Sequence, residues 1–529
     1  MTTQLQNLPI GIQHFETLRK NDYLYVDKTA RLLQLIRTGA WYFLARPRRF
    51  GKSLTVSTLD AMFSGKADLF AGLAAEDWVR EQARHPSPVL RLDMSTMTSD
   101  TPETLRQSLN AALARRARRA GLQLEASLPG DRLQDLLLLL SEQHGPVVVL
   151  IDEYDKPILD HMDDLKHADS MRRVLRDFYA VLKGCNEYLR FVLLTGISRF
   201  TKTGVFSAMN NLRDISMMPK FGDIVGYTQA ELESSFASWL DDAADKRQTT
   251  RAALLNRVRD YYDGFCFDGV TRVYNPFSVL NFCDTAEFFN FWYKSASPSF
   301  LVHYMKQHAI ADPEDYRLLE VSEDFADAQE IERANPASFL FQAGYLTIVG
   351  WEEQALILDY PNREVLDSLS RMYLEHVYLV PGFTPLGSRL WRALKDGNLD
   401  EALRLYNTAL SGIPYQDFAE PVRESFYRAL FLMLLRGAGV TAGGEICGSL
   451  GRSDVVALFS GRAVVLEFKL APDTGAIPRL QEEGLKQIAD KGYARPFDGA
   501  GRAVTAAVVV IDATTRQATC RRGPESFFA

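Results

Sequence analysis

Residues suited to phosphate binding lie together near the N-terminal end of the chain. Gly51-Lys52-Ser53 closes the run RPRRFGKS, which begins at Arg46. A P-loop reads G-x-x-x-x-G-K-[ST], and it offers backbone N–H groups, a lysine charge and a hydroxyl ligand for Mg²⁺ to a nucleotide. We therefore expect Gly51 to let the backbone approach phosphate, Lys52 to contact the terminal phosphates and Ser53 to bind Mg²⁺. Arg46 replaces the first glycine, and a basic loop that caps a helix is the alternative interpretation.

An acidic motif of the kind that accompanies a P-loop follows later in the chain. Residues 147–151 form the apolar run VVVLI, which ends in Asp152 and Glu153. In P-loop NTPases an acidic side chain at such a strand end holds the Mg²⁺ shell, and a second group orients or deprotonates the attacking water. We expect Asp152 and Glu153 to take these two roles. The alternative is a buried strand whose acidic end faces solvent.

A further apolar run, residues 191–195, leads into Ser198 and Arg199. At this strand end Ser198 could sense the γ-phosphate and Arg199 could stabilise transferring charge, although structural turn residues would give the same pattern. The residues expected to bind the nucleotide are therefore Arg46, Arg48, Arg49, Phe50, Gly51, Lys52, Ser53, Asp152, Ser198 and Arg199.

A second and separate set of reactive residues lies near the C-terminal end. Asp454, Glu467 and Lys469 form the pattern D-x₁₂-E-x-K across a hairpin predicted to turn at residues 460–461. Residues two apart on a strand share a face, and a neighbouring antiparallel strand can bring Asp454 beside them. Two carboxylates suit Mg²⁺ or Mn²⁺, and a lysine can position a water. This is the chemistry of metal-assisted phosphodiester hydrolysis, although an edge strand with alternating polar residues would show the same spacing.

The pattern of helices and strands around these residues predicts an α/β protein. Short apolar runs alternate with amphipathic stretches up to about residue 225, which indicates a mostly parallel sheet flanked by helices. The runs are residues 41–45, 89–93, 147–152 and 191–195, and the helical stretches are 53–63, 104–119 and 170–186. Residues 228–435 are mainly helical, with strand-like residues 345–358. Strands return at 455–459, 463–469 and 503–511, with a helix at 479–492.

The first part of the chain resembles a known family in several motifs at once. RPRRFGKSL, LIDEYDKPI, TGISRF and NNLRDIS, together with YVDKT, YDGF and YNPF, are similar to those of the AAA-ATPase-like family of bacterial proteins with an appended nuclease domain. They cover residues 8–280. In that family the arginine-rich loop without the first glycine is the usual form. The resemblance implies a P-loop ATPase that uses ATP and Mg²⁺.

The C-terminal pattern resembles the PD-(D/E)xK nuclease superfamily, with Ser453 in place of the usual proline. The resemblance implies that Gln487, on the helix after the hairpin, is a catalytic residue and that Glu445, before the hairpin, is an acidic ligand; Glu424 is a further candidate that a solvated helix explains equally well. The catalytic residues expected overall are Glu153, Asp454, Glu467, Lys469 and Gln487. The metal ligands expected are Ser53, Asp152, Glu445, Asp454 and Glu467.

Composition narrows the class of protein. With 60 Lys+Arg against 67 Asp+Glu, the net charge of −7 excludes a wholly basic nucleic-acid coat protein but not a local basic surface. The run RRARR at residues 115–119 could contact phosphate, although a solvated helix face is the more ordinary interpretation. The five cysteines show no paired spacing, and neither a signal peptide nor a membrane span is apparent. We expect a cytoplasmic protein that does not associate with a membrane.

Together these features predict four segments. They are a P-loop AAA-like ATPase core (1–227), its helical or α+β extension (228–380), a helical connector (381–439) and a PD-(D/E)xK nuclease-like domain (440–529). The resemblance implies a DNA partner and a place in defence against foreign DNA or in mobile-element biology, while RNA and a homo-oligomer stay open. The alternative function is a nucleotide-controlled switch that binds a protein or nucleic acid with little or no cleavage.

Overall fold

The computed structural model describes residues 5–199, 205, 209, 211–292, 302, 305, 313–326, 335–353, 355–378, 380, 383–413, 423–448, 451–459, 461–498 and 502–524. The chain divides into two compact units. Unit 1 comprises Met1–His303 and Leu318–Glu364, and unit 2 comprises Tyr304–Arg317 and Val365–Ala529. Of the four segments expected from the sequence, the first lies in unit 1, the last two lie in unit 2 and the second is shared. Within the described ranges, no helix is both long and apolar enough to cross a membrane.

The centre of unit 1 is a five-stranded parallel sheet with the strand order β2-β3-β4-β1-β5. Its strands are β1 (Trp41–Ala45), β2 (Val89–Asp93), β3 (Val147–Asp152), β4 (Leu189–Gly196) and β5 (Arg213–Asp214). β1 and β3 are buried along their whole length, as is usual for parallel strands covered on both faces. The predicted parallel sheet is thus confirmed.

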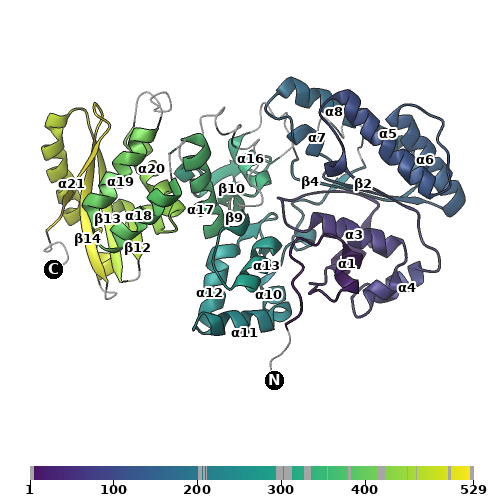
Figure 1. The fold of residues 1–529 in the computed structure, drawn as a ribbon, viewed down its shortest axis with the longest axis horizontal. Helices are drawn as coiled ribbons and strands as arrows, with labels where there is room; N and C mark the ends of the chain where they lie inside the picture. Colours follow the sequence, from purple (N-terminus) through teal and green to yellow (C-terminus); the bar gives the residue numbers. More distant parts are fainter. Residues whose placement is uncertain are drawn as a thin grey trace. The chain divides into compact units, whose positions relative to one another are not determined.

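Helices cover both faces of this sheet (Figure 1). One side carries α1 (Phe15–Lys20), α3 (Lys52–Phe63) and α4 (Glu76–Gln82), and the other carries α5 (Pro102–Arg119), α6 (Pro129–His144), α7 (Lys156–Leu159) and α8 (Leu165–Gly184). Helix α5 starts at an N-cap, Thr101, and buries Leu105, Leu109 and Leu113. This four-residue spacing makes one apolar face, which packs against α6 and α8.

The strand order decides which segments meet at the carboxyl-terminal edge of the sheet. β4 lies between β1 and β3, with Ala45 paired to Gly196 and Ile151 paired to Leu194. The loop after β1, the carboxylates after β3 and the segment after β4 therefore leave the sheet next to one another. Open α/β sheets bind their ligands at this edge.

The rest of unit 1 consists of helices and two small antiparallel sheets. Besides α2 (Thr29–Thr38), it contains α10 (Gln229–Ser235), α11 (Ala237–Lys246), α12 (Arg251–Tyr262), α13 (Pro276–Thr285) and α16 (Pro336–Ala343). Strand β6 (Phe265–Cys266) pairs with β7 (Arg272–Val273), and β8 (Leu319–Ser322), β10 (Ala355–Asp359) and β9 (Thr347–Glu352) form a sheet in that order. The region is α+β, as residues 345–358 predicted. Asn275 caps α13 by accepting from the N–H groups of Phe277 and Ser278.

Unit 2 is built on a mixed five-stranded sheet with the order β11-β12-β13-β14-β15. The strands are β11 (Thr441–Gly448), β12 (Gly451–Phe459), β13 (Arg462–Ala471), β14 (Ala503–Asp512) and β15 (Ala518–Arg522), and only β13 and β14 pair in parallel. Helix α21 (Ile477–Lys491) makes the crossover between them, and α20 (Glu424–Gly437) lies on the other side of the sheet (Figure 1). The remaining long helices are α17 (Arg363–Met372), which begins at the division between the units, α18 (Phe383–Lys395) and α19 (Leu399–Gly412).

Candidate functional site

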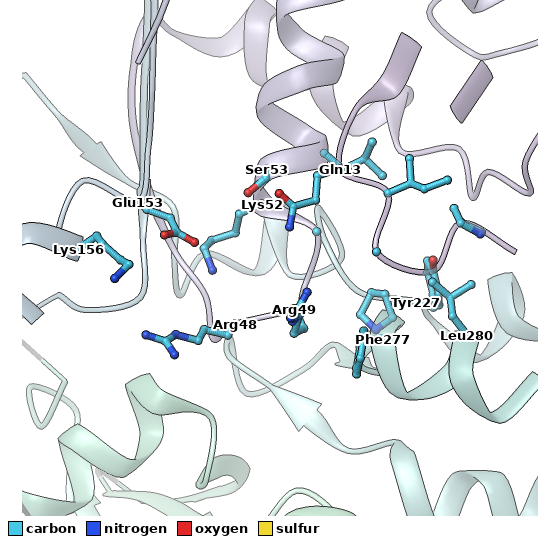
Figure 2. Close-up of a pocket in the computed structure, with 16 residues that line it drawn as sticks. Gln13, Arg48, Arg49, Lys52, Ser53, Glu153, Lys156, Tyr227, Phe277 and Leu280 are labelled. Carbon is cyan, nitrogen blue, oxygen red and sulfur yellow. The ribbon is translucent and has the colours of Figure 1, made fainter. Parts of the chain in front are cut away.

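A cavity of about 370 Å³ opens at the carboxyl-terminal edge of the unit 1 sheet. Its volume lies in the range of small-molecule sites. One end is charged and the other is apolar and aromatic (Figure 2). The lining residues are Pro9, Gly11, Ile12, Gln13, Arg48, Arg49, Gly51, Lys52, Ser53, Leu54, Glu153, Lys156, Tyr227, Pro276, Phe277 and Leu280. The structure thus brings together six of the expected site residues, namely Arg48, Arg49, Gly51, Lys52, Ser53 and Glu153.

The loop geometry at the charged end is that of an anion site. Gly51 has φ +97° and Arg49 has φ +69°, and this left-handed backbone turns the chain into the first residue of α3. No side chain caps α3, so its first N–H groups are not used by the N-cap residue and point towards the cavity end of the helix. The Lys52 ammonium donates to the carbonyl oxygens of Arg46 and Pro47, at 2.8 Å and 2.9 Å.

Lys52 and Glu153 form an electrostatic pair across this end of the cavity (Figure 2). Burial lowers the pKa of Lys52, and the nearby charge of Glu153 acts in the opposite direction. Burial likewise raises the pKa of Glu153, against the effect of Lys52. A carboxylate with a raised pKa is suited to accept a proton from water. Glu153 also has φ +50°, a strained backbone for a residue other than glycine.

Asp152 lies just beneath the cavity lining. Its side chain is buried with only 1% exposure, and one carboxylate oxygen accepts from Thr195 Oγ1 at 2.5 Å and from the Glu153 N–H at 3.1 Å. Asp152 is paired in register with Asp93 at the end of β2. It therefore stands one layer deeper than Glu153, next to the end of β4.

Asp155 is a site residue to which the sequence analysis assigned no function. Its buried carboxylate accepts from the N–H groups of Ile197 and Ser198, at 3.0 Å and 2.7 Å, and from Ser198 Oγ at 2.8 Å. Burial raises the pKa of Asp155, and the bonds from Ser198 lower it. Gly196 fits here because a Cβ would lie 2.5 Å from the Tyr154 ring. Asp155 thus fixes the end of β4 to the segment after β3.

Arg46 and Phe50 are absent from the cavity lining, and their expected contact with the nucleotide stays a prediction. The Arg46 guanidinium is buried, donates to the carbonyl oxygens of Ala45 and Ser216, and lies over the Phe267 ring at 4.4 Å. Burial lowers the pKa of Arg46 to about 10. The Phe50 ring is buried and meets Phe265 edge-on at 4.9 Å. Both side chains face the protein interior, where they anchor the loop from behind.

Ser198 and Arg199 are also held by other side chains and are absent from the cavity lining. The Ser198 hydroxyl donates to Asp155, and Arg199 forms a largely buried ion pair with Asp214 at 3.0 Å. The Arg199 N–H donates to Gln342 at 2.5 Å. Their expected roles as a γ-phosphate sensor and a charge stabiliser stay predictions.

The apolar end of the cavity comes from segments that the sequence analysis did not connect with the P-loop. Tyr227, Phe277 and Leu280 line it (Figure 2). The Arg49 guanidinium lies 4.9 Å from the centre of the Phe277 ring, so it bridges the two ends. An aromatic surface next to the P-loop is suited to stacking against a flat base.

In unit 2 the hairpin places Asp454 beside Glu467. β12 and β13 are antiparallel, and their ladder ends at the pair Val455–Leu466, so Asp454 and Glu467 are the residues that adjoin this last pair. Asp454 Oδ2 accepts from the Phe468 N–H at 2.7 Å, and Lys469 Nζ donates to Glu467 Oε1 at 2.7 Å. Val456 and Val465, two residues from the carboxylates, belong to one core cluster with Ile488 of α21, while Arg428 of α20 also reaches Asp454.

Glu467 is the most unusual group of this site. Its residue is 1% exposed, and its Oε2 atom has no hydrogen-bond partner within the described part of the chain. Burial, and then the charge of Asp454, raise the pKa of Glu467 to about 7, although the bond from Lys469 lowers it. A buried carboxylate oxygen without a partner is costly, and a divalent cation satisfies such an oxygen.

Other side chains surround this pair. Arg428 of α20 lies 3.4 Å from Asp454, and burial raises the pKa of Glu424, which also senses the charges of Lys469 and Asp454. Gln487 of α21 donates to the Tyr493 hydroxyl at 3.3 Å. Glu445 lies in β11 at the ladder position across from Asp454, between the pairs Gly444–Val455 and Ile446–Ser453.

The side chain of Glu445, the third expected acidic ligand of this site, lies outside the described part of the structure. Among the described residues, no three His, Cys, Asp or Glu side chains are gathered as a metal site. The carboxylates of Asp454 and Glu467 are nonetheless the kind of oxygen ligand that Mg²⁺ and Mn²⁺ prefer, and the buried Glu467 Oε2 atom has no hydrogen-bond partner among the described residues.

Comparisons with known proteins support both an N-terminal ATPase-like domain and a C-terminal nuclease-like domain. A family model described as predicted AAA-ATPase matches residues 9–206, and one for the PD-(D/E)XK nuclease superfamily matches residues 422–519. A protein of Azotobacter chroococcum mcd 1, named as an uncharacterized protein in the vnfD 5′ region, is 32% identical over 510 residues, which cover 94% of this chain and 95% of that protein.

Two solved structures share a weaker likeness. The Walker-type ATPase PABY2304 of Pyrococcus abyssi is 12% identical with a TM-score of 0.35, over 70% of this chain and 99% of that one. The Aeropyrum pernix ORC1 protein, solved in complex with DNA, is 10% identical with a TM-score of 0.27, over 82% of this chain and 90% of that one. From the near full-length match and the two family models, the chain belongs to the family of the A. chroococcum protein, in which an AAA-ATPase-like domain is joined to a C-terminal PD-(D/E)XK nuclease domain.

Proposed function

We propose that unit 1 binds and hydrolyses ATP with Mg²⁺ and that unit 2 cleaves DNA phosphodiester bonds with Mg²⁺ or Mn²⁺. One observation carries the nuclease half: the buried Oε2 atom of Glu467 has no partner among the described residues, while the charge of Asp454 acts on Glu467 and Lys469 bonds the other oxygen. A cation held by Asp454 and Glu467 would satisfy that oxygen and supply positive charge to the scissile phosphate. Glu445 is proposed as a further ligand because its ladder position faces Asp454.

The hydrolytic step follows from this placement. Lys469 lies on the same face as Glu467 and can orient a water against the phosphorus atom. The water oxygen forms the new P–O bond and its proton passes to solvent or to a neighbouring base, while the bond from phosphorus to the leaving sugar oxygen breaks and that oxygen takes up a proton from solvent. Gln487, on the helix that faces the group, is proposed to position the DNA or the water.

In unit 1 the proposed nucleotide spans the two ends of the cavity. Lys52 and the N-terminus of α3 would hold the phosphates, Ser53 and Asp152 would serve Mg²⁺, and Glu153 would activate water. The base would stack at the aromatic end, on Phe277 and Tyr227. Support for this assignment is that the charged and aromatic linings belong to one cavity.

We further propose that ATP controls cleavage and that the protein acts in the cytoplasm, in defence against foreign DNA or in mobile-element biology. A second function has one observation in its favour. Both nuclease carboxylates already contact cationic side chains, Asp454 with Arg428 at 3.4 Å and Glu467 with Lys469 at 2.7 Å. Such pairing would suit a nucleotide-controlled switch that binds its partner with little or no cleavage.

The experiment that separates these functions uses the whole chain. Plasmid, linear duplex, single-stranded DNA and RNA are incubated with Mg²⁺, Mn²⁺ or EDTA, with and without ATP. Wild type is compared with Lys52→Ala and Lys469→Ala, and with Lys183→Ala and Lys491→Ala, which replace exposed lysines of α8 and α21. We expect cation-dependent cleavage that Lys469→Ala abolishes, and ATP hydrolysis that Lys52→Ala abolishes. ATP hydrolysis without cleavage of any substrate would favour the switch.

A further inference from the structure

The C-terminal half of α5 gathers positive charge that forms no ion pair with the described acidic residues. Arg115, Arg118 and Arg119 are exposed on this helix, and Arg116 is half-buried beside Arg91 of the edge strand β2. Within the described part of the chain, no carboxylate lies within ion-pair distance of any of these five arginines. We call these five residues the α5 arginine surface.

The charges of Arg91, Arg115 and Arg119 act on the guanidinium group of Arg116. Arg116 donates to the carbonyl oxygen of Arg91 at 2.8 Å, which fixes the helix end against the edge strand. Burial lowers the pKa of Arg116, and the charges of Arg119, Arg91 and Arg115 lower it further, although Asp60 acts in the opposite direction. The charges are therefore near enough to repel one another, although the chain as a whole is acidic.

Elsewhere in unit 1, several exposed arginines on or next to helices are paired, whereas others, such as Arg37 of α2 and Arg259 of α12, have no ion pair among the described residues. Arg84 contacts Glu81 at 2.9 Å, and Arg173 contacts Asp169 at 2.6 Å. On α5 itself, Arg106 contacts Glu103 at 2.9 Å. The last turns of α5 thus differ from its earlier turns, where Arg106 is paired.

Stability of the helix does not account for this clustering. A helix C-terminus gains about 0.3–1 kcal/mol from a nearby cation. Arg115 with Arg119, and Arg116 with Arg119, stand four and three residues apart, and like charges at these spacings cost a similar amount. A cluster that opposes itself in the free protein is suited to an anionic partner that neutralises it.

We propose that the α5 arginine surface binds the phosphate backbone of duplex DNA. Guanidinium groups form paired hydrogen bonds with phosphate oxygens, and several arginines on one helix edge match a line of phosphates better than an isolated anion. The contact reads charge and not base sequence, because backbone contacts position a protein without specifying a site. This surface lies in unit 1, on a segment that does not contribute to the P-loop cavity, so the inference is independent of the proposed cleavage in unit 2.

The test measures binding without cleavage. A fluorescein-labelled 30-base-pair duplex is titrated in EDTA by fluorescence anisotropy, with the whole chain as wild type, as R115Q/R118Q/R119Q and as R84Q/R173Q/R176Q. The second triple variant is matched in charge and replaces exposed arginines that are ion-paired. We expect the α5 variant to raise Kd about tenfold and the matched variant to change it less than about twofold. The slope of log K against log salt should fall in size by about 2 to 3 for the α5 variant alone, at about 0.9 per phosphate contact.

Other outcomes also decide the matter. The charge-keeping variant R115K/R118K/R119K should bind within about threefold of wild type, since non-specific backbone contacts need charge above all. The Tm of each of the three variants should be close to the wild-type Tm or above it. A change in Kd can then be attributed to DNA binding and not to unfolding. The proposal would be overturned if the two triple Gln variants weakened DNA binding equally, or if neither of them weakened it. Competition by poly-L-glutamate as strong as that by DNA, charge for charge, would assign the surface to an acidic protein and would also overturn it.

Discussion

Asp155 holds Ser198 through two hydrogen bonds to one carboxylate oxygen, from the backbone N–H at 2.7 Å and from the hydroxyl at 2.8 Å. These residues follow β3 and β4, the two strands whose ends flank the catalytic edge of the sheet. These bonds therefore fix the segment after β4 to the segment after β3, although neither residue lines the cavity.

We predict that Asp155→Asn impairs hydrolysis more than binding. An amide keeps the volume but turns one acceptor into a donor, which leaves three donors facing fewer acceptors. ATP turnover should fall about tenfold or more, because small displacements at a reacting centre are costly. Nucleotide Kd should change less than about threefold. Asp177→Asn, at an exposed position of α8, serves as the control. Turnover that stays at the wild-type value would show that the Asp155–Ser198 bond has no part in catalysis.

Arg46 and Arg48 should separate stability from binding, although both belong to the arginine-rich loop. Arg46→Met removes a buried guanidinium from Ser216 and Phe267 and should lower the free energy of unfolding by about 2 kcal/mol, with little change in ATP affinity. Arg48→Met removes a cavity-lining charge and should weaken ATP binding about fivefold with an unchanged Tm. Calorimetric melting and ATP titration check both. The reverse assignment of effects would return Arg46 to the phosphate site.

Phe277→Ala tests the aromatic end of the cavity. Loss of base stacking should raise the Kd for ATP about tenfold, since stacking on an aromatic side chain contributes about 1–3 kcal/mol. The affinity for inorganic tripolyphosphate should not change, because Lys52 and α3 are untouched. Phe289→Ala, at a half-exposed ring outside the cavity, is the matched control. Equal losses for ATP and tripolyphosphate would mean that Phe277 supports the loop and does not contact the base.

Glu467 should make the metal-free protein sensitive to pH. Its pKa is raised from 4.5 to about 7. Between these values the folded state binds more protons than the unfolded state, so this contribution to stability is present below pH 4.5 and is lost as the pH rises through 7. In EDTA, Glu467→Gln should match wild type at pH 5 and be more stable at pH 8, by about 1–3 kcal/mol. Thermal melting at both pH values, with the exposed Glu483→Gln as control, checks this. A Glu467→Gln variant that is less stable at pH 8 would show that the bond from Lys469 outweighs the burial of charge.

Sequence predicted the fold well where the physical signal is local. The buried runs of β1 and β3 are continuous because parallel strands are covered on both faces, and the four-residue stripe of α5 is the part of that helix that packs. The sequence analysis omitted β11 and β15. β11 contains Gly443, Gly444 and Gly448, and glycine gives no alternation, while β15 is short and polar.

The candidate sites could be predicted only in part. Lys52, Ser53 and Glu153 meet at the cavity because motif spacing and strand order act together. The roles of Arg46 and Asp155 depend on burial and on distant partners such as Ser216 and Ser198, which no local spacing encodes. The aromatic wall was missed for the same reason, since Tyr227 and Phe277 come from segments far from the P-loop in sequence.

Plasmid cleavage by the Glu467→Gln variant tests the proposed nuclease most directly. The initial rate of nicking of supercoiled plasmid is measured at pH 8 in Mg²⁺ for wild type, Glu467→Gln and the control Glu483→Gln. We predict that wild type and Glu483→Gln nick the plasmid at equal rates and that Glu467→Gln loses at least about 100-fold, because the neutral amide is a poor substitute for a buried carboxylate ligand. Cleavage by Glu467→Gln at the wild-type rate would contradict the assignment of this carboxylate as the metal ligand of a nuclease.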